Sequence, residues 1–468
     1  MTTQAIHFGT SGWRGIIAGD FNFSGVRRAA AAIAAHLSAQ RQSPSVLVAH
    51  DTRFFSEEFG RACAHVLHKK GCRVSLCQEP VPTPAVAHAI IHGQFDGGIN
   101  ITASHNPYDY NGLKFSGAEG GPALPEVTKD IEKRAAPLKD EPFRLEDIRE
   151  PFPAVHPRAP YFAQLERLVR FDVLANSGGS FVFDALHGCG AGWLDALLEK
   201  HGIPVAAIRT RRDVLFEGRG PDPSEENLSQ LKAALLARTA LAGLATDGDA
   251  DRFGILDRDG SFVSPNHILA LLFDYLLETR GVKLGVSRSV ATTHLLDAVA
   301  ALHGVKVYET PVGFKYVGPR LRADEILLGG EESAGMTIRG HVPEKDGVLA
   351  CLLVAEMIAA RKSSLREQLR DLFRRSGAEC WPIRVNLHVS GEIHEKIPEI
   401  LKRDPRDFAG RRVARVDRTD GLKLLLEGGA WVLMRPSGTE PVVRVYSEAS
   451  SLAESQRLVA EARTWIGA

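Results

Sequence analysis

Short apolar runs of strand length alternate with stretches of helical periodicity through most of the chain. Near the start, the apolar run at 45–51 precedes an amphipathic stretch at 56–70, which leads into a second apolar run at 72–78. Ser24 is placed to cap an earlier helix over 26–37. Because strands that alternate with helices pair mostly in parallel, this pattern predicts an α/β fold in which helices cover the faces of the sheets.

Three such units follow one another before the periodicity of the apolar residues changes. The charged, proline-rich segment 137–160 predicts the first boundary. From about Cys380 onward, runs such as WPIRVNLHV and LKLLLEG alternate as antiparallel strands do. We therefore predict three related α/β domains with mixed, mostly parallel sheets and a C-terminal α+β domain, at residues 1–150, 151–258, 259–375 and 376–468.

Composition narrows the class of partner and the compartment. Lys plus Arg and Asp plus Glu both number 57, so the formal net charge is zero and we expect no nucleic-acid partner. No apolar run approaches the ~20 residues that span a bilayer, and the N-terminus lacks the regions of a signal peptide. The six cysteines form no C-x-x-C pair. We therefore expect reduced thiols and a cytoplasmic protein with no membrane partner.

The motif TASHNP at 102–107 follows the apolar run GGINI. Open α/β sheets hold their sites at the carboxyl ends of strands, and Ser104 there could act as a nucleophile or phosphoryl carrier. His105 and Lys114 are close enough in sequence to assist it. The residues of Ser-His-Asn-Pro also favour turns, so the motif alone is equally compatible with a plain turn. No G-x-S-x-G surrounds Ser104, which excludes a hydrolase nucleophile elbow.

Three aspartates, Asp247, Asp249 and Asp251, follow the apolar run LAGLAT. Carboxylates at alternating positions of a loop can converge on one hard cation, which relieves their mutual repulsion. An EF-hand is excluded because Arg252 and Arg258 stand where that loop needs Gly and Glu. A solvated acidic turn is the alternative, but a set of carboxylate donors favours Mg²⁺.

Two later motifs carry polar groups suited to a sugar phosphate. GGEESAG at 329–335 places two carboxylates and a hydroxyl beside small residues, which could bind sugar hydroxyls or form a polar turn. RPSGTEP at 435–441, with Arg444 beyond it, has the components of an anion-binding nest or of a capped turn. Lys345, in HVPEKDG, is either a phosphate contact or a surface lysine.

The order of these motifs along the whole chain, beginning with FGTSGWRG at 8–15, resembles that of the alpha-D-phosphohexomutase superfamily. The resemblance implies four domains around a central cleft, the last of which closes over a hexose phosphate. It also implies that Ser104 is the phosphoserine and a ligand, with the three aspartates, of one Mg²⁺. The predicted catalytic residues are then Ser104, Lys114, Arg14 and His105. The predicted substrate contacts are Arg252, Lys315, Glu331, Ser333, Lys345, Arg435, Ser437, Gly438, Thr439 and Arg444.

The implied reaction is an intramolecular phosphoryl transfer. Phospho-Ser104 gives its phosphoryl group to a sugar 6-phosphate, the 1,6-bisphosphate turns around, and the other phosphate returns to the serine. Ala334-Gly335 stand where mutases that accept mannose and glucose carry Gly-His, so the motif looks more like that of phosphoglucomutases. We therefore expect phosphoglucomutase activity with glucose 1,6-bisphosphate as activator and intermediate, in a monomer or homodimer. Phosphomannomutase, dual-specificity and phosphoglucosamine mutase activities are alternatives, as are a silent sugar-phosphate binding protein and a phosphatase.

Overall fold

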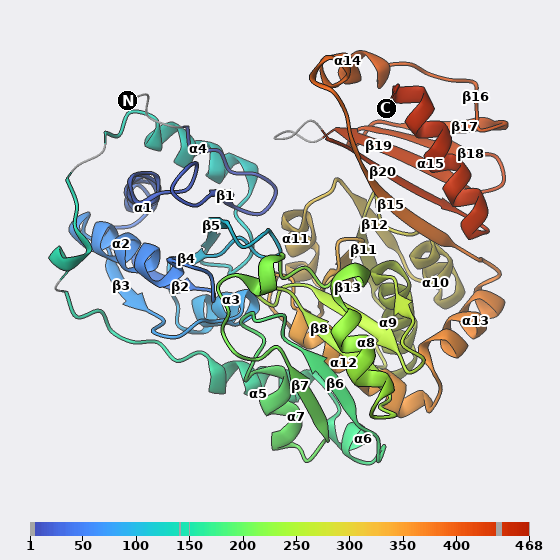
Figure 1. Ribbon diagram of the computed structural model, residues 1–468, viewed down its shortest axis with the longest axis horizontal. Helices are drawn as coiled ribbons and strands as arrows, with labels where there is room; N and C mark the ends of the chain where they lie inside the picture. The colour runs from blue at the N-terminus through green and yellow to red at the C-terminus, as the bar shows by residue number, and fades with distance from the viewer. Residues whose placement is uncertain (1–4, 140–141, 149, 437–441, 468) are drawn as a thin grey trace. The chain divides into compact units, whose positions relative to one another are not determined.

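The computed structural model describes residues 5–139, 142–148, 150–436 and 442–467 (Figure 1). The chain divides into two compact units. Unit 1 consists of Met1–Pro265, Gly313–Asp324 and Ser333–Leu365, and unit 2 consists of Asn266–Val312, Glu325–Glu332 and Arg366–Ala468. Neither unit is one continuous segment, because the chain passes between them several times.

The first sheet of unit 1 has five strands in the order β1–β5–β4–β2–β3. The strands are β1 Trp13–Ile16, β2 Ser45–His50, β3 Arg73–Leu76, β4 Gly97–Ile101 and β5 Tyr110–Gly117. The pairs β2–β3 and β2–β4 are parallel, whereas β5 is antiparallel to both β4 and β1. Its helices are α1 Phe23–Ser38, α2 Ser56–Lys69, α3 Thr83–His92 and α4 Pro125–Ala135. Val46, Val48, Ile99 and Ile101 join the apolar residues of α1 and α2 in one core.

The second sheet repeats this arrangement in the order β10–β9–β8–β6–β7. The strands are β6 Phe181–Asp184, β7 Val205–Ile208, β8 Ala242–Thr246, β9 Phe253–Asp257 and β10 Phe262–Val263. The pairs β6–β7 and β6–β8 are parallel, and β9 is antiparallel to both β8 and β10. Its helical elements are α5 Arg158–Leu168, α6 Phe171–Ala175, α7 Leu194–Lys200, η2 Phe216–Gly218, η3 Glu225–Asn227 and α8 Ser229–Leu236, whereas the preceding η1 Leu145–Asp147 contacts α2. In each sheet an antiparallel hairpin therefore follows the central strand, from β4 to β5 and from β8 to β9.

Later segments of the chain complete unit 1, and they are η4 Phe314–Tyr316, α11 Val317–Arg322, β14 Gly335–Ile338 and α12 Gly347–Arg361. Helix α12 packs on β8 and β9 and is buried along almost its whole length, which its continuous apolar sequence GVLACLLVAEMIAAR explains. Asp346 caps it by accepting a hydrogen bond from Leu349 N at 2.8 Å. A Cβ on Gly347 would collide with the carbonyl oxygen of Arg252, so only glycine lets this helix begin against the turn between β8 and β9.

Unit 2 contains a parallel set of strands and an antiparallel sheet. Strands β12 Val307–Thr310, β11 Gly285–Ser289 and β13 Ile326–Glu331 lie side by side in that order, with α9 Pro265–Thr279 and α10 Leu295–His303. The C-terminal sheet has the order β15–β20–β19–β18–β17–β16, and its described pairs are antiparallel. Its strands are β15 Trp381–His388, β16 Asp407–Phe408, β17 Arg411–Asp417, β18 Leu422–Leu426, β19 Trp431–Pro436 and β20 Val442–Ala449. The remaining helices are α13 Leu365–Ser376, α14 Gly391–Ile400 and α15 Leu452–Ile466, the last of which packs on β15 and β20.

The predicted fold class is confirmed by the mixed sheets with their helices and by the antiparallel C-terminal sheet. The domain boundaries after residues 150, 258 and 375 stay predictions. The predicted cap of the first helix is wrong, because Asn22 rather than Ser24 accepts a hydrogen bond from Gly25 N, at 3.0 Å. Across the described residues, we find no helix whose length and hydropathy would let it cross a membrane.

Candidate active site

The Ser104 loop, residues 102–109, joins β4 to β5 at the carboxyl end of β4. Ser104 N donates to Thr102 Oγ1 at 2.9 Å, and Asn106 N donates to Ala103 O at 3.1 Å. Ser104 has a φ of 54°, in the left-handed region that residues with a side chain rarely adopt. Such strain persists only where the surrounding structure holds it, and it gathers at functional loops.

The side chain of Ser104 faces the predicted metal loop. Its Oγ donates a hydrogen bond to Asp247 Oδ2 at 2.6 Å, although the two residues are 143 apart in sequence. Asp247, Asp249 and Asp251 are buried, and they offer ligand oxygens that all lie within 4.8 Å of one another. Asp249 Oδ1 and Asp251 Oδ1 have no hydrogen-bond partner in the described part of the chain. Orphaned carboxylate oxygens beside a serine hydroxyl form a set of donors that suits a hard divalent cation.

Two lysines neutralise the opposite oxygens of the same carboxylates. Lys114 Nζ donates to Asp249 Oδ2 at 2.6 Å and to Asp251 Oδ2 at 2.7 Å. Lys345 Nζ lies 3.0 Å from Asp251 Oδ2. Burial alone would lower the pKa of Lys114, but the charges of Asp249 and Asp251 outweigh burial and raise it above its usual value. The ammonium is therefore charged near neutral pH and can act as a cation or as a proton donor.

The pKa values of the aspartates reflect how closely these charges are packed. Burial, and then repulsion from Asp249 and Asp251, raises the pKa of Asp247 well above its usual value. Burial acts in the same direction on Asp251, but Lys114, Lys345 and Arg252 outweigh it and lower its pKa. A divalent cation would turn the repulsion into attraction and favour the ionised form of each carboxylate. The residues present therefore fit a metal ion in donor type, in orphaned oxygens and in charge.

Arg14, His105 and Arg252 lie around this cluster. Arg14 Nη1, on β1, donates to Asn106 Oδ1 at 2.6 Å, which ties β1 to the Ser104 loop. Burial, and then the charge of Arg252, lowers the pKa of Arg14 to about 10, so its guanidinium stays charged at neutral pH. His105 Nδ1 is 3.3 Å from Ser104 Oγ, and Arg252 Nε is 3.9 Å from Asp251 Oδ1. Unit 1 thus brings together Ser104, His105, Lys114, Arg14, Asp247, Asp249, Asp251, Arg252 and Lys345.

The predicted sugar contacts lie on other segments. Lys315, in η4 of unit 1, has its Nζ 5.5 Å from the centre of the Tyr316 ring, and Ser333 is half-buried in the same unit. Glu331 is buried at the end of β13 in unit 2, so that strand continues through the first half of the glycine motif. The neighbouring Glu332 accepts hydrogen bonds from two hydroxyls of unit 2, those of Ser289 at 3.0 Å and Thr292 at 3.2 Å.

The described ends of the predicted phosphate motif lie on β19 and β20 of unit 2. Arg435 and Arg444 stand directly opposite each other in this antiparallel ladder. Like charges at such a position are destabilising unless a counter-charge is near, and Asp420 Oδ1 accepts from Arg435 Nε at 2.8 Å. Ser437, Gly438 and Thr439 lie outside the described residues.

Comparison with known proteins supports the same reading along the whole chain. Four family models match, described as phosphoglucomutase/phosphomannomutase alpha/beta/alpha domains I, II and III and the C-terminal domain, at residues 5–141, 159–260, 264–376 and 386–464. The chain belongs to the phosphoglucomutase/phosphomannomutase family. It is accordingly a phosphohexomutase, an intramolecular phosphotransferase of the isomerase class.

Individual members of the phosphoglucomutase/phosphomannomutase family resemble the chain over nearly its full length. A phosphoglucomutase/phosphomannomutase from Thermococcus kodakarensis is 31% identical over 95% of this chain and 94% of the relative. A phosphoglucomutase from Komagataeibacter xylinus is 29% identical over 100% of this chain and 92% of the relative. A crystal structure from Thermus thermophilus, provisionally assigned as a phosphomannomutase, has a TM-score of 0.89 and 35% identity over 100% of both chains. These names agree on the class of reaction but not on the hexose.

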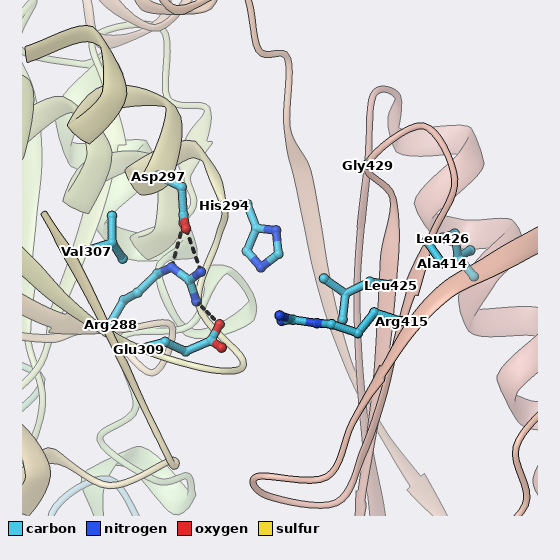
Figure 2. Close-up of a pocket in the computed structure, with 10 residues that line it drawn as sticks. All are labelled: Arg288, His294, Asp297, Val307, Glu309, Ala414, Arg415, Leu425, Leu426 and Gly429. Atoms are coloured by element: carbon cyan, nitrogen blue, oxygen red, sulfur yellow. Dashed lines mark hydrogen bonds and ion pairs between the residues drawn. The ribbon is translucent and has the colours of Figure 1, made fainter. Parts of the chain in front are cut away.

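A cavity of about 550 Å³ in unit 2 lies among residues that the family resemblance did not single out (Figure 2). Arg288, on β11, donates there to both oxygens of Asp297 at 2.6 and 2.8 Å and to Glu309 Oε2 at 2.6 Å. Figure 2 shows Arg415 from β17 on the other wall. Because the Arg288 guanidinium is already bound by two carboxylates, the cavity presents a balanced polar surface rather than a cationic one.

Three supporting residues of this phosphohexomutase were missed by sequence reasoning, namely Thr83, Asn100 and Arg53. Thr83 Oγ1 donates to Asp249 Oδ2 at 2.5 Å, and Asn100 Nδ2 donates to Thr83 Oγ1 at 2.9 Å. Arg53 binds the backbone of the Ser104 loop. Thr83 lies in PVPTP, which indicates only an interruption, and Arg53 lies in DTRFF. Both segments follow the carboxyl end of a parallel strand, and the rule that selected Ser104 would have selected them too.

Proposed function

We propose that this chain interconverts glucose 1-phosphate and glucose 6-phosphate through phosphorylated Ser104 and a glucose 1,6-bisphosphate that reorients in the site. One observation carries the proposal: Ser104 Oγ contacts Asp247 Oδ2 at 2.6 Å within a buried group of three aspartates. A phosphoryl group on Ser104 would stand beside both the candidate metal ligands and their lysines. Membership of the family supports the same class of chemistry.

The residues of the site have different proposed roles in phosphoryl transfer. Ser104, Asp247, Asp249 and Asp251 would hold one Mg²⁺, which when bound would neutralise charge on the phosphoryl oxygens. Arg14 adds a guanidinium that is anchored to the loop through Asn106. For the rest of the substrate we propose Arg252, Lys315 and Lys345 as phosphate contacts, Glu331 and Ser333 as sugar contacts, and Arg435, Ser437, Gly438, Thr439 and Arg444 as the site of the phosphate that is not transferred.

The transfer conserves atoms and protons. In the first half-reaction the bond between phosphorus and Ser104 Oγ breaks as a bond forms to the acceptor hydroxyl of glucose 6-phosphate. That hydroxyl loses a proton, and Ser104 Oγ gains one. Lys114 is the proposed carrier between the two oxygens: its ammonium gives a proton to Ser104 Oγ as the bond to phosphorus breaks, and the resulting amine takes the proton of the acceptor hydroxyl. After the bisphosphate turns around, the same steps run in reverse with the other phosphate.

The preference for glucose rests on the Ala334-Gly335 pair in the sugar motif. Phosphomannomutase activity is the second candidate, because the Thermus thermophilus structure with that assignment is 35% identical. Glucose and mannose phosphates differ at one stereocentre, and a single hydroxyl contact can decide between them. Phosphoglucosamine mutase activity is tested alongside both.

The first experiment measures the mass of the intact protein as purified and after incubation with glucose 1,6-bisphosphate. We expect an increase of about 80 Da, the mass of one phosphoryl group, that is absent in Ser104→Ala. An unmodified wild-type protein that nevertheless turns over would contradict the phosphoserine mechanism. A silent binding protein would take up no phosphate, and a phosphatase would release inorganic phosphate without a bisphosphate primer.

The second experiment compares kcat/KM for the 1-phosphates of glucose, mannose and glucosamine, each with Mg²⁺ and the matching 1,6-bisphosphate. We expect the highest value for glucose 1-phosphate. A higher value for mannose 1-phosphate or glucosamine 1-phosphate would overturn the glucose preference while leaving the mutase class intact. The variant Ala334→Gly combined with Gly335→His supplies the pair found in mutases that accept both sugars, and we expect it to narrow the gap between glucose and mannose.

A further inference from the structure

We propose that Arg53 is a positioning residue that fixes the backbone of the Ser104 loop for phosphoryl transfer. The proposal rests on the proposed function, in which Ser104 carries the phosphoryl group. Arg53 follows β2, and its side chain is 0% exposed. A buried guanidinium needs polar partners that offset the cost of taking its charge out of water, and the backbone carbonyls of this loop supply them.

The guanidinium of Arg53 binds three carbonyl oxygens of the Ser104 loop and the carbonyl of Tyr110, the first residue of β5. Its Nη2 donates to the carbonyls of Ser104 at 2.6 Å and Asn106 at 2.7 Å. Its Nη1 donates to the carbonyls of Pro107 at 2.7 Å and Tyr110 at 3.0 Å. A planar fork with several fixed donors can satisfy converging acceptors of this kind, whereas an ammonium at the end of a flexible chain cannot reach them all.

The guanidinium is itself held in place by its neighbours. Its Nε lies 3.2 Å from Asp51 Oδ2, and Asp51 Oδ1 accepts from Arg53 N at 2.9 Å and from Ser56 Oγ at 2.6 Å. The ring of Phe216 lies against it, with 5.1 Å between the guanidinium carbon and the ring centre. The guanidinium is thus held in position by residues outside the Ser104 loop, so it can determine the geometry of that loop.

The Ser104 loop has need of such a support. The paired residues of β4 and β5 end at Ile101 opposite Leu113, so the carbonyls of Ser104 and Asn106 lie beyond that ladder. Ser104 itself is held at a φ of 54°, in a region that a residue with a side chain keeps only where the surrounding structure holds it. By fixing the carbonyl of Ser104, Arg53 also fixes the peptide plane that follows it, because the peptide group is planar.

Charge alone is an alternative explanation, and it makes a different prediction. Burial lowers the pKa of Arg53, whereas the charges of Asp51, Asp249 and Asp247 act in the opposite direction, so the residue is close enough to the metal loop to act by charge. Arg53→Lys keeps the positive charge and loses the fork, whereas Arg53→Gln loses both. If Arg53 acts by positioning the loop, both variants should lose activity to the same extent. If it acts by charge alone, Arg53→Lys should keep the activity that Arg53→Gln loses.

The experiment compares the wild type with Arg53→Lys, Arg53→Gln and the control Arg212→Lys. Arg212 is a matched control because its guanidinium also donates to backbone carbonyls, but to those of Thr52 and Arg53 rather than to those of the Ser104 loop. With glucose 1-phosphate, Mg²⁺ and glucose 1,6-bisphosphate, we expect both Arg53 variants to lose about 10²-fold in kcat, the scale of a nucleophile misplaced by about 1 Å. We expect KM to stay within about twofold, and the control to stay within about twofold in both constants. The ³¹P resonance of phospho-Ser104 should broaden or shift in the Arg53 variants only.

Wild-type kcat in Arg53→Lys, or a fall in kcat and a rise in KM together with an unchanged ³¹P resonance, would overturn the proposal. If the Arg53 variants do not fold, Asp51→Asn takes their place, because it loosens the anchor of the fork and leaves the four bonds possible. We then expect about a tenfold lower kcat at unchanged KM, and wild-type kcat would count against the proposal. A wild-type protein that shows neither phosphoserine nor mutase activity would instead refute the proposed function.

Discussion

The Ser104 loop and the aspartate loop occupy the same place in two sheets of the same strand order, yet they are built in different ways. The aspartate loop has internal bonds, from Asp247 N to Arg252 O at 3.3 Å and from Ala250 N to Asp247 O at 3.0 Å. The carbonyls of Gly248, Asp249 and Ala250 accept from backbone N–H groups of other segments. The β8–β9 pairing also continues to its very edge, at Thr246 opposite Phe253. The Ser104 loop is wider, and a side chain, that of Arg53, binds its carbonyls.

This difference shows that the strand topology determines where the two loops lie, whereas the backbone of each loop determines which reactive groups it can present. A tight turn places three carboxylates at fixed spacing, which is what a cation site requires. A wider loop held from outside lets one hydroxyl meet both the metal loop and a substrate. Each loop also holds a non-glycine residue in the left-handed region, Ser104 at φ 54° and Ala250 at φ 56°.

Replacing the Ser104 hydroxyl tests whether the two loops take part in one reaction. We expect Ser104→Ala to lower kcat about 10⁴-fold or more, because the proposed carrier of the phosphoryl group is removed and loss of a nucleophile has effects of that size. Mutase assays and intact mass measure the change. Ser75→Ala, on β3, is the matched control and should behave as the wild type. Substantial turnover by Ser104→Ala would mean that the two loops do not share one reaction.

Removing the metal tests the other loop. We expect EDTA to lower kcat about 10³-fold, because a bound cation contributes several kcal/mol to stabilising the charge of the transition state. Mg²⁺ should restore activity, and Asp249→Asn should need more Mg²⁺ for half-maximal rate. Activity that is independent of EDTA and of Mg²⁺ would leave the aspartate loop with a structural role only.

Adding one methyl group tests the contact between the two loops. A Cβ on Gly248 would lie 2.6 Å from the carbonyl oxygen of Ser104 and 2.8 Å from Pro221 Cγ. We expect Gly248→Ala to push the loops apart, at a cost of about 1–3 kcal/mol in unfolding free energy and about 10²-fold in kcat. Thermal unfolding and mutase assays measure the two effects. Gly391→Ala, where a Cβ meets nothing within 4 Å, is the control.

Two threonine variants make the smallest and most selective test. Thr83→Val removes a hydrogen bond to Asp249, and Thr102→Val removes the acceptor of Ser104 N. Each loss is worth about 1 kcal/mol, or about fivefold. We expect Thr83→Val to raise the Mg²⁺ concentration for half-maximal rate, and Thr102→Val to lower kcat at unchanged Mg²⁺ dependence. If the two effects were exchanged, the division of labour between the loops would be wrong.

Sequence reasoning reached the fold class, Ser104 and the three aspartates through local patterns, whereas the roles of Arg14 and Arg252 came only from the family resemblance. Alternating periodicities predict strands and helices, and Ser104 and Asp247 each follow an apolar strand. The same reasoning could place Lys114 only as near in sequence to Ser104. Its contact with Asp249 spans 135 residues, and no local pattern encodes a contact of that range.

The supporting residues show a related limit. The position of Arg53 and Thr83 after parallel strands could have marked their segments as candidates, but their hydrogen bonds to the Ser104 loop and to Asp249 join distant parts of the chain, and their own neighbourhoods indicate ordinary turns. Helix ends show the same limit at short range. Asn22 and Ser24 both favour a cap position, and only the backbone shows that Asn22 holds it.

The long reach of the Ser104–Asp247 contact has a consequence for how activity appears during folding. Closing a contact over 143 residues has an entropic cost that local contacts do not. Lys345, which meets Asp251, comes later still, so a chain growing from its N-terminus acquires this cation last. Until then the three aspartates have no complete set of partners. Catalytic activity should thus be among the last properties to emerge during synthesis or refolding, after much of the secondary structure has formed.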